Sequence, residues 1–515
     1  MRKLLYLLFI IIPLVGCWSK NNSDDNINSN MIFTNENQVQ SDLLLYDLVH
    51  SDDKIVLTSD IPLTLNPIIN SDADVAQMLN LVFDTLVNIE PDGSVTPNLA
   101  KYYTVNESDN SVTLVLDENV LWHDGTPISA DDVIYSIHLL KESKNSFYYV
   151  NAQNISYVTS LSPNTVKIFY TVPFSGVLQT LFFPIIPEHI YEKHSNPIPP
   201  VGSGPYKYLE EISQKELNLI RNPDYFNGSP IIEYIDIYYT PNHMAALSAF
   251  DLGLIDAIYT EIMNWGKYEK VANIHEVFTN KYEFIGMNFN NKVLNDYKVR
   301  QVLNYALNKQ QLINIYYLGK GTVSETPISP NSYLYTQHDT TLDKDFIAAL
   351  LIQAGYTPDN PLKLRMLINE DNIERALFAE GLINMYAQHG IIIIPEYVDA
   401  NTFNRRVLDG EFELFLGGYK FSYVPDLSFL LHSNSDNLVN YKNQEMDILL
   451  DRAFTSNPDD MVSAYNHLQE YFIAQFPYIS LFFKSGALIT SDRIHGVLSP
   501  APLNIYKDIE LWYIK

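Results

Sequence analysis

The sequence predicts an α/β protein of two or three domains, and three observations lead to this prediction. Its 515 residues are more than one hydrophobic core supports. Hydrophobic residues make up 46% and aromatic residues 13% of the chain, which is typical of globular proteins and not of disordered ones. In the second half, strand-like segments alternate with helix-like ones, a pattern that indicates βαβ units and a mixed sheet.

The first third of the folded part is predicted to be rich in strands. It begins with the strand-like segment 54–58, and segments 111–116 and 165–170 are similar. Alternation in 111–116 places every second residue from Val112 onward on one face, as in a half-buried strand.

A turn and a helix are predicted between two of these strands. His123-Asp124-Gly125 has the composition of a tight turn in which Gly125 takes a positive φ. Asp131 or Asp132 is then placed to cap a helix that carries Val133, Ile137 and Leu140 on one side.

The later half is predicted to be more helical. Apolar residues recur at helical spacing in 299–307, 446–453 and 461–472. Segment 345–354 has helix-forming residues and is followed by Gly355, a residue type that ends helices. Strand-like segments lie between them, at 362–368, 391–398 and 412–416.

The N-terminus has the features of an export signal. Arg2 and Lys3 precede an apolar run of about ten residues, which is shorter than the roughly 20 that span a membrane. The run ends in Leu14-Val15-Gly16-Cys17, which holds the only cysteine and resembles the lipobox of bacterial lipoproteins. This resemblance implies cleavage after residue 16, lipidation (palmitate) of Cys17 and anchoring to a membrane outside the cytoplasm. Residues 17–53, rich in Asn, Ser and Asp, are predicted to be a flexible tether.

Charge and motifs exclude several functions. The formal net charge of −28 argues against binding to nucleic acid or to anionic lipid. The chain has no GxSxG, HExxH or Walker motif, and Gly202-Ser203-Gly204-Pro205 lacks the lysine that a phosphate-binding loop needs. His189 and His194 are only a weak metal signal. We therefore predict no catalytic residues, no metal site and no cofactor.

Nine motifs in order resemble the family 5 extracellular solute-binding proteins, the peptide- and nickel-binding subunits of ABC importers. The longest is Leu121-Trp-His-Asp-Gly-Thr-Pro-Ile-Ser-Ala-Asp-Asp-Val-Ile-Tyr-Ser136. The others lie at 61–67, 83–100, 200–207, 221–226, 298–307, 350–356, 441–447 and 477–481.

The resemblance implies a two-lobed clam of mixed sheets flanked by helices, with ligand between the lobes. Lobe I is expected to comprise 54–67, 200–280 and 479–515, with a smaller β-rich domain, 68–199, inserted into it. Lobe II is expected at 281–478, and the crossovers near 280 and 478 would form a hinge. A closed form would be presented to a membrane permease.

One stretch departs from the family pattern. Peptide-binding relatives often end a strand of the second lobe with a Gly-Trp pair and an Asp that binds the peptide amine. Here Tyr419 replaces the Trp and Ser422 replaces that Asp. We expect Gly418, Tyr419, Ser422, Tyr423 and Asp426 to line the cleft. Asp426, the only acid in the stretch, either replaces the missing carboxylate or caps the helix that follows.

The expected function is that of the substrate-binding lipoprotein of an ABC importer, a monomer that delivers oligopeptides to a permease and ATPase complex. Three alternatives stay open. The same fold could bind a nickel or other metal chelate or an oligosaccharide. The chain could also be an adhesin or signalling receptor, or a surface hydrolase, which would require a nucleophile that no motif indicates.

Overall fold

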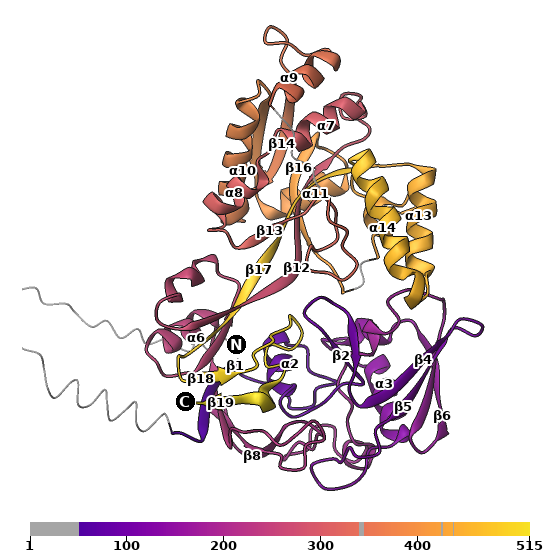
Figure 1. The fold of residues 1–515 in the computed structure, drawn as a ribbon, viewed down its shortest axis with the longest axis vertical. Coiled ribbons are helices and arrows are strands. Elements are labelled where there is room, and N and C mark those ends of the chain that lie inside the picture. Colours follow the sequence, from indigo (N-terminus) through magenta and orange to yellow (C-terminus); the bar gives the residue numbers. More distant parts are fainter. Residues whose placement is uncertain (1–50, 339–343, 424–425, 436) are drawn as a thin grey trace, which may run out of the picture. The chain divides into compact units, whose positions relative to one another are not determined.

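The computed structural model describes residues 51–338, 344–423, 426–435 and 437–515, and residues 49–515 form one compact unit. The predicted signal, most of the predicted tether and Cys17 lie outside the described residues. The architecture is α/β with two lobes, as expected (Figure 1). No helix in the described ranges combines the length and the apolar composition that crossing a membrane requires.

A mixed sheet of four strands organises the first lobe. Its order is β1 (Lys54–Asp60), β10 (Tyr234–Thr240), β9 (Glu216–Arg221) and β8 (Tyr206–Ile212). Only β1 and β10 are parallel, and each is followed by a helix, α2 (Ala73–Leu79) and α6 (His243–Asp251). The carboxyl ends of β1 and β10 therefore lie side by side, with Asp60 paired to Thr240.

An antiparallel sheet lies in the segment predicted to be inserted. Its order is β4 (Ala100–Asn106), β5 (Ser111–Leu116), β7 (Thr165–Tyr170) and β6 (Ile155–Ser162). Helix α3 (Ala130–Glu142) packs against β6 and β7, and the short elements β2 (Val87–Ile89), β3 (Val95–Pro97), α4 (Tyr149–Ala152) and α5 (Glu188–Tyr191) complete the region. One continuous hydrophobic core joins this sheet to that of β1 and β10.

The turn before α3 forms as predicted, and its helix cap differs. Gly125 has a φ of +86°, and its N–H donates to the carbonyl of Trp122 at 2.8 Å. The N-cap of α3 is Ser129 rather than Asp131 or Asp132. Asp132 instead accepts from the N–H and the hydroxyl of Ser129, at 2.8 and 2.9 Å, which makes a capping box.

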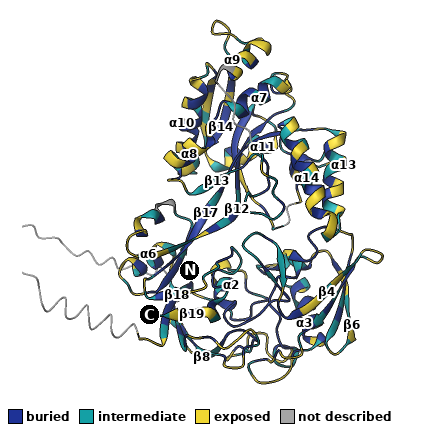
Figure 2. Cartoon of the chain, in the orientation of Figure 1, coloured by how far each residue is buried: buried dark blue, intermediate teal, exposed yellow. Residues whose placement is uncertain are grey.

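The third sheet has seven strands and belongs mainly to the second lobe. Its order is β11 (Ala257–Thr260), β17 (Tyr478–Thr490), β12 (Asn273–Met287), β16 (Leu414–Lys420), β14 (Lys363–Asn369) and β15 (Ile392–Val398), and β13 (Gly321–Val323) pairs with β17. Around it are α7 (Tyr297–Tyr305), α8 (Lys309–Tyr316), α9 (Lys344–Gln353), α10 (Ile373–Ala387), α11 (Ala400–Leu408), α12 (Ser428–Leu431), α13 (Gln444–Thr455) and α14 (Pro458–Gln475). The predicted apolar stripes of α7, α13 and α14 face inward (Figure 2).

Two long strands connect the lobes. Strand β12 has 15 residues and β17 has 13, and they pair with each other along most of their length. Figure 1 shows both running from the part that carries α6 to the part that carries α7. Their register shifts between Phe278 and Tyr282 and between Glu283 and Phe284. Such irregularities weaken a ladder locally, so this is where the pair bends most readily.

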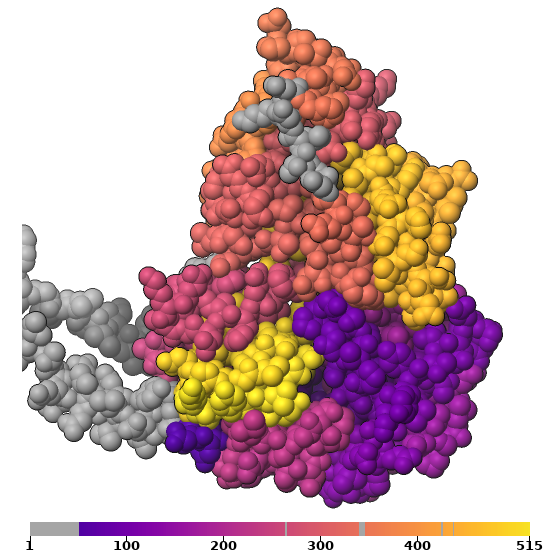
Figure 3. Space-filling view, viewed as in Figure 1, coloured from indigo at the N-terminus to yellow at the C-terminus, as the bar shows by residue number. Residues whose placement is uncertain are grey.

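The C-terminal residues return to the first lobe. Strands β18 (Ile494–Gly496) and β19 (Trp512–Ile514) pair there, and Ile505, Tyr506 and Trp512 join the same core as β8, β9 and β10. The N–H of Ile231 donates to the carbonyl of Glu510 at 3.3 Å. The space-filling view shows this yellow segment packed against the violet and magenta parts of the chain (Figure 3).

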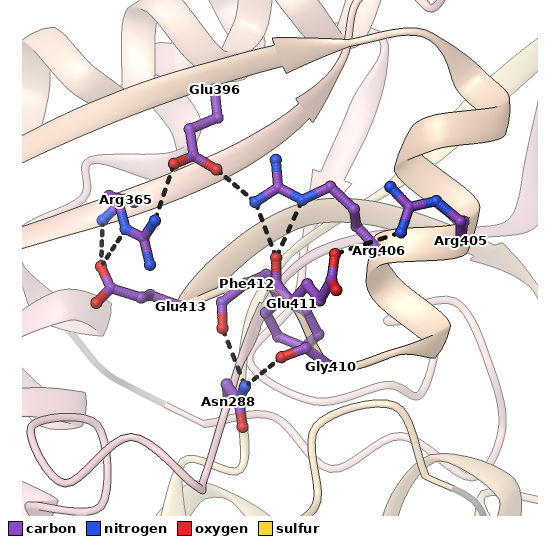
Figure 4. A network of polar contacts seen from close by, with 9 residues as sticks. All are labelled: Asn288, Arg365, Glu396, Arg405, Arg406, Gly410, Glu411, Phe412 and Glu413. Carbon is purple, nitrogen blue, oxygen red and sulfur yellow. Dashed lines mark hydrogen bonds and ion pairs between the residues drawn. The ribbon is translucent and has the colours of Figure 1, made fainter.

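A polar network covers the end of β14, β15 and α11 (Figure 4). Glu396 pairs with Arg365 at 3.3 Å and with Arg406 at 2.6 Å, and Arg406 also donates to the carbonyl of Glu411. The side chain of Arg365 is 53% exposed. Exposed ion pairs contribute little, at most about 1 kcal/mol each, so this network orients the 409–413 loop more than it stabilises the fold.

Candidate ligand-binding cavity

A cavity of about 540 Å³ is lined by residues of both lobes. From the first lobe come the carboxyl ends of β1 and β10, the starts of α2 and α6, strand β11 and residues 502–506. From the second come the end of β16, Tyr317, Lys320 and Glu374, and the connecting strands β12 and β17 border it as well. Ligands of open α/β proteins bind beyond the carboxyl ends of parallel strands, which is where this cavity lies.

Charges of both signs line the cavity. The acids are Asp60, Asp74, Glu261 and Glu374, and the lysines are Lys281, Lys320, Lys420 and Lys484. Some of these charges are paired within the protein. Lys281 contacts Glu261, and the ammonium of Lys484 lies 3.1 Å from Glu374.

Asp60 and Asp74 have no such partner among the described residues. Burial, followed by the charge of Asp72, raises the pKa of Asp60, whereas His243 lowers it. Burial, followed by the charges of Asp60 and Asp72, likewise raises the pKa of Asp74. Asp74 is exposed to the cavity, so these crowded carboxylates can be reached by a ligand.

Three hydroxyl groups beside the cavity have no hydrogen-bond partner among the described residues. They belong to Ser59, Ser485 and Tyr423. Ser59 is 4% exposed and Ser485 is 3% exposed. A buried hydroxyl without a partner costs free energy, and functional sites are one place where such groups occur.

The two lobes also touch away from the connecting strands. The N–H of Tyr333 donates to the carbonyl of Asp92 at 3.1 Å, and the N–H of Ser175 donates to the carbonyl of Phe454 at 2.7 Å. Tyr423 packs on the core of the first lobe, and a Cβ on Gly93 would lie 3.6 Å from its ring.

The predicted stretch 418–426 is divided between different places. Tyr423 lines the interlobe cavity. Gly418 and Tyr419 line a second cavity of about 420 Å³, together with Phe284, Arg375 and other side chains of the second lobe. Ser422 is exposed, and neither it nor Asp426 lines these two cavities.

Asp426 makes a local contact. Its Oδ1 accepts from the N–H of Ser428, the first residue of α12, at 2.9 Å. This contact supports the helix-cap alternative for Asp426, although the N-cap position itself is Leu427.

Gly418 has a clear structural role. Strands β12 and β16 place it opposite Glu283, whose carboxylate forms two hydrogen bonds of 2.9 Å with the guanidinium of Arg375. A Cβ at residue 418 would lie 2.3 Å from Nη2 of Arg375 and 2.7 Å from Oε1 of Glu283. Glycine is therefore needed here because a buried ion pair passes directly over the strand.

The other sequence candidates are structural. His123 is half-buried, and this burial lowers its pKa to about 4. Its ring contacts the N–H of Gly202 and the carbonyl of Gly204, so Gly202-Ser203-Gly204 is a packing segment. His189 pairs with Asp124 at 2.7 Å. Within the described ranges, no group of three or more His, Cys, Asp or Glu side chains is arranged to hold a metal ion.

Sequence reasoning missed Asp60 and Asp74. The chain has 61 acidic residues, so neither was conspicuous. The sequence did hold one indication, the position of Asp60. It follows the strand-like segment 54–58, and residues at the carboxyl end of a parallel strand often contact a ligand.

Comparisons with known proteins agree with this geometry. The oligopeptide-binding protein AppA of Bacillus subtilis is 23% identical over 505 residues, covering 88% of this chain and 90% of AppA. The crystal structure of the ABC transporter substrate-binding protein CtaP of Listeria monocytogenes has a TM-score of 0.73 at 24% identity and covers 90% of this chain and all of CtaP. NikZ of Campylobacter jejuni in complex with Ni(L-His) has a TM-score of 0.63 at 23% identity, with 90% and 100% covered.

The family assignment rests on the sequence profile of the bacterial extracellular solute-binding proteins, family 5, which matches residues 94–466. Its relatives are solute-binding proteins of ABC transporters and not enzymes. With the two-lobed fold and the cavity between its lobes, these matches show that the chain belongs to family 5 of the bacterial extracellular solute-binding proteins.

Proposed function

We propose that the chain binds oligopeptides between its lobes and delivers them to the permease of an ABC importer. The observation that carries this proposal is an unpaired strand edge. Strand β16 pairs with β12 through residues 414–420 but with β14 only through Leu414 and Phe415. Among the described residues, Gly417–Lys420 therefore have no partner strand on their second edge.

This strand edge borders both cavities. Gly417, Gly418 and Tyr419 line the smaller cavity, and Lys420 lines the interlobe cavity. A peptide can add a strand to such an edge through main-chain hydrogen bonds, and adjacent pockets then receive its side chains. Tyr419, 46% exposed, offers an apolar ring and a polar hydroxyl beside that path.

Hinge bending would open and close the site. The register shifts in β12 and β17 are the proposed hinge, and the contacts of Tyr333 with Asp92 and of Ser175 with Phe454 join the two lobes on the far side of the cavity from it. Ligand would favour closure because it contacts both lobes only when they are together. The proposed domains keep their predicted bounds: lobe I of 54–67, 200–280 and 479–515, the insertion 68–199, and lobe II 281–478.

The direct test is mass spectrometry of ligand that co-purifies with the protein, followed by calorimetry with the peptides identified and by solution scattering. We expect peptides, and a smaller radius of gyration when they are bound. Co-purified nickel–histidine or oligosaccharide, with no peptide binding, would instead support the corresponding alternative and refute the peptide proposal.

The lipoprotein part of the proposal has its own test. Radiolabelled palmitate should enter the wild-type protein, which should sediment with membranes outside the cytoplasm. The Cys17→Ser variant should do neither. Labelling and sedimentation of the variant to the wild-type extent would show that Cys17 is not the anchor.

A further inference from the structure

We infer that Asp60 and Asp74 form a subsite for a cationic group of the ligand, an ammonium or a guanidinium. This inference rests on the proposed peptide function and specifies which end or side chain of the peptide binds on the first-lobe side of the interlobe cavity. It assigns the recognition of positive charge to the end of β1 and the start of α2 instead of to the stretch that contains Asp426.

Asp60 and Asp74 have no internal counter-charge in the described part of the chain. Two other acids of the cavity are paired with lysines, since Glu261 contacts Lys281 and Glu374 lies 3.1 Å from Lys484. Among the described residues, no lysine or arginine lies within ion-pair distance of Asp60 or Asp74, and no donor hydrogen-bonds to their carboxylates. Their negative charge is left for a ligand to neutralise.

The carboxylates also repel one another. Asp72 accepts from the N–H groups of Asp74 and Val75 as the N-cap of α2, so its charge is fixed beside the other two, and Glu261 adds negative charge near Asp74. His243 acts on both Asp60 and Asp74 in the opposite sense, and its Nε2 contacts the hydroxyl of Thr260 at 3.0 Å. Like charges held together beside a cavity favour the arrival of a cation.

Two hydroxyl groups beside the cavity also lack a partner. Those of Ser59 and Ser485 are buried and have no hydrogen-bond partner among the described residues. Both residues line the cavity. A ligand ammonium has three donors, so it can bind more than one acceptor of the cavity wall.

Asp426 is less suited to this role. Its Oδ1 is occupied by the N–H of Ser428, and the residue lines neither of the two cavities that contain other residues of its stretch. Asp60 and Asp74, by contrast, reach the cavity from two elements that the parallel pair β1 and β10 holds in place.

The test compares pools of random pentapeptides on protein freed of its native ligand. One pool has free amino termini and a second is N-acetylated and lacks Lys and Arg. A third is N-acetylated and contains them. We expect the wild type to retain the first pool at least tenfold better than the second. If the third pool is retained as well as the first, the cation is a basic side chain. If the third pool is retained no better than the second, the cation is the terminal ammonium.

Substitutions locate the effect. Asp60→Asn and Asp74→Asn should each reduce the preference for the cationic pool about tenfold or more, with little change for the second pool. Asp224→Asn, which removes one exposed carboxylate outside the cavity, is the matched control and should keep the preference. Melting temperatures of all three variants check that the fold is intact.

A measurement on the wild type makes the test independent of the variants. A cation binds the ionised forms of Asp60 and Asp74, whose pKa values are raised above 3.8, so the preference for the first pool should be weaker at pH 4 than at pH 7. Retention of the first and second pools at the two pH values measures this change. Equal retention of the charged and uncharged pools, or a preference that does not weaken at pH 4, would overturn the cation subsite and leave the peptide function standing. Retention of none of the pools would overturn both.

Discussion

Substitution of Gly418 by alanine tests whether the ion pair over β16 depends on the missing side chain. The new Cβ would lie 2.3 Å from Nη2 of Arg375 and 2.7 Å from Oε1 of Glu283, so the guanidinium and the carboxylate must shift, and we expect this to weaken or break one of their two hydrogen bonds of 2.9 Å. The side chains of Arg375 and Glu283 are 15% and 5% exposed, so water cannot fully replace the lost contact. A hydrogen bond to a charged group contributes about 1.5–3 kcal/mol. We therefore expect Gly418→Ala to lower the free energy of unfolding by about 2 kcal/mol.

The assay is urea unfolding followed by the fluorescence of the four tryptophans. Gly266→Ala is the control, because a Cβ there would meet its nearest neighbour at 3.4 Å and the stability should change by less than about 0.5 kcal/mol. In the Arg375→Ala background, Gly418→Ala should cost clearly less than in the wild type, since the guanidinium that it displaces is gone. Additive losses in the double variant would refute the reasoning, because they would show that the two residues do not act through one contact.

Three further predictions concern stability. Lys309→Met should destabilise the protein by about 3–5 kcal/mol in chemical unfolding, because it leaves Glu325 as an unpaired buried charge. The carboxylate of Glu325 is 9% exposed and lies 2.6 Å from the ammonium of Lys309. The double variant Lys309→Met/Glu325→Leu should lose less stability than the single variant, and an equal or greater loss would contradict this explanation. Burial raises the pKa of Asp84 from 3.8 to about 6, so its contribution to stability is present below pH 4 and is lost as pH rises through 6. The stability of Asp84→Asn relative to wild type should therefore rise by about 2.4 kcal/mol between pH 4 and pH 7, and a flat difference would contradict the assignment. Gly202→Ala should cost about 1–3 kcal/mol or more in thermal or chemical unfolding, because its Cβ would lie 1.9 Å from the carbonyl oxygen of Val82, which is backbone and cannot turn aside; wild-type stability would show that the segment is not tightly packed there.

Local sequence patterns determined many of the elements. The stripe of α7, the stop of α9 at Gly355 and the strand 111–116 follow from spacing and residue type, because helix and strand periodicity depend only on near neighbours in the chain. The turn at Gly125 follows from the freedom of glycine to take a positive φ. The cap of α3 was placed two or three residues late, since an Asp and a Ser are both acceptable at an N-cap and only the geometry chooses between them.

Family motifs extended the prediction from elements to lobes. The order of nine short motifs predicted a two-lobed fold that composition and periodicity alone did not reach. The bounds of the domains stay predictions, because one continuous core joins the first sheet, the β-rich segment and the C-terminal residues.

The site is where the tertiary structure decided most. Gly418, Tyr419 and Tyr423 were predicted together because they fall in one family motif, yet the first two line one cavity and the third lines another. Asp60 and Asp74 come from different elements, and their proximity depends on how α2 packs against β1. The sequence determined which groups the chain possesses. Which carboxylates lack a counter-ion was decided by long-range strand pairing and packing, because charge pairing depends on distances of a few ångströms that no local pattern fixes.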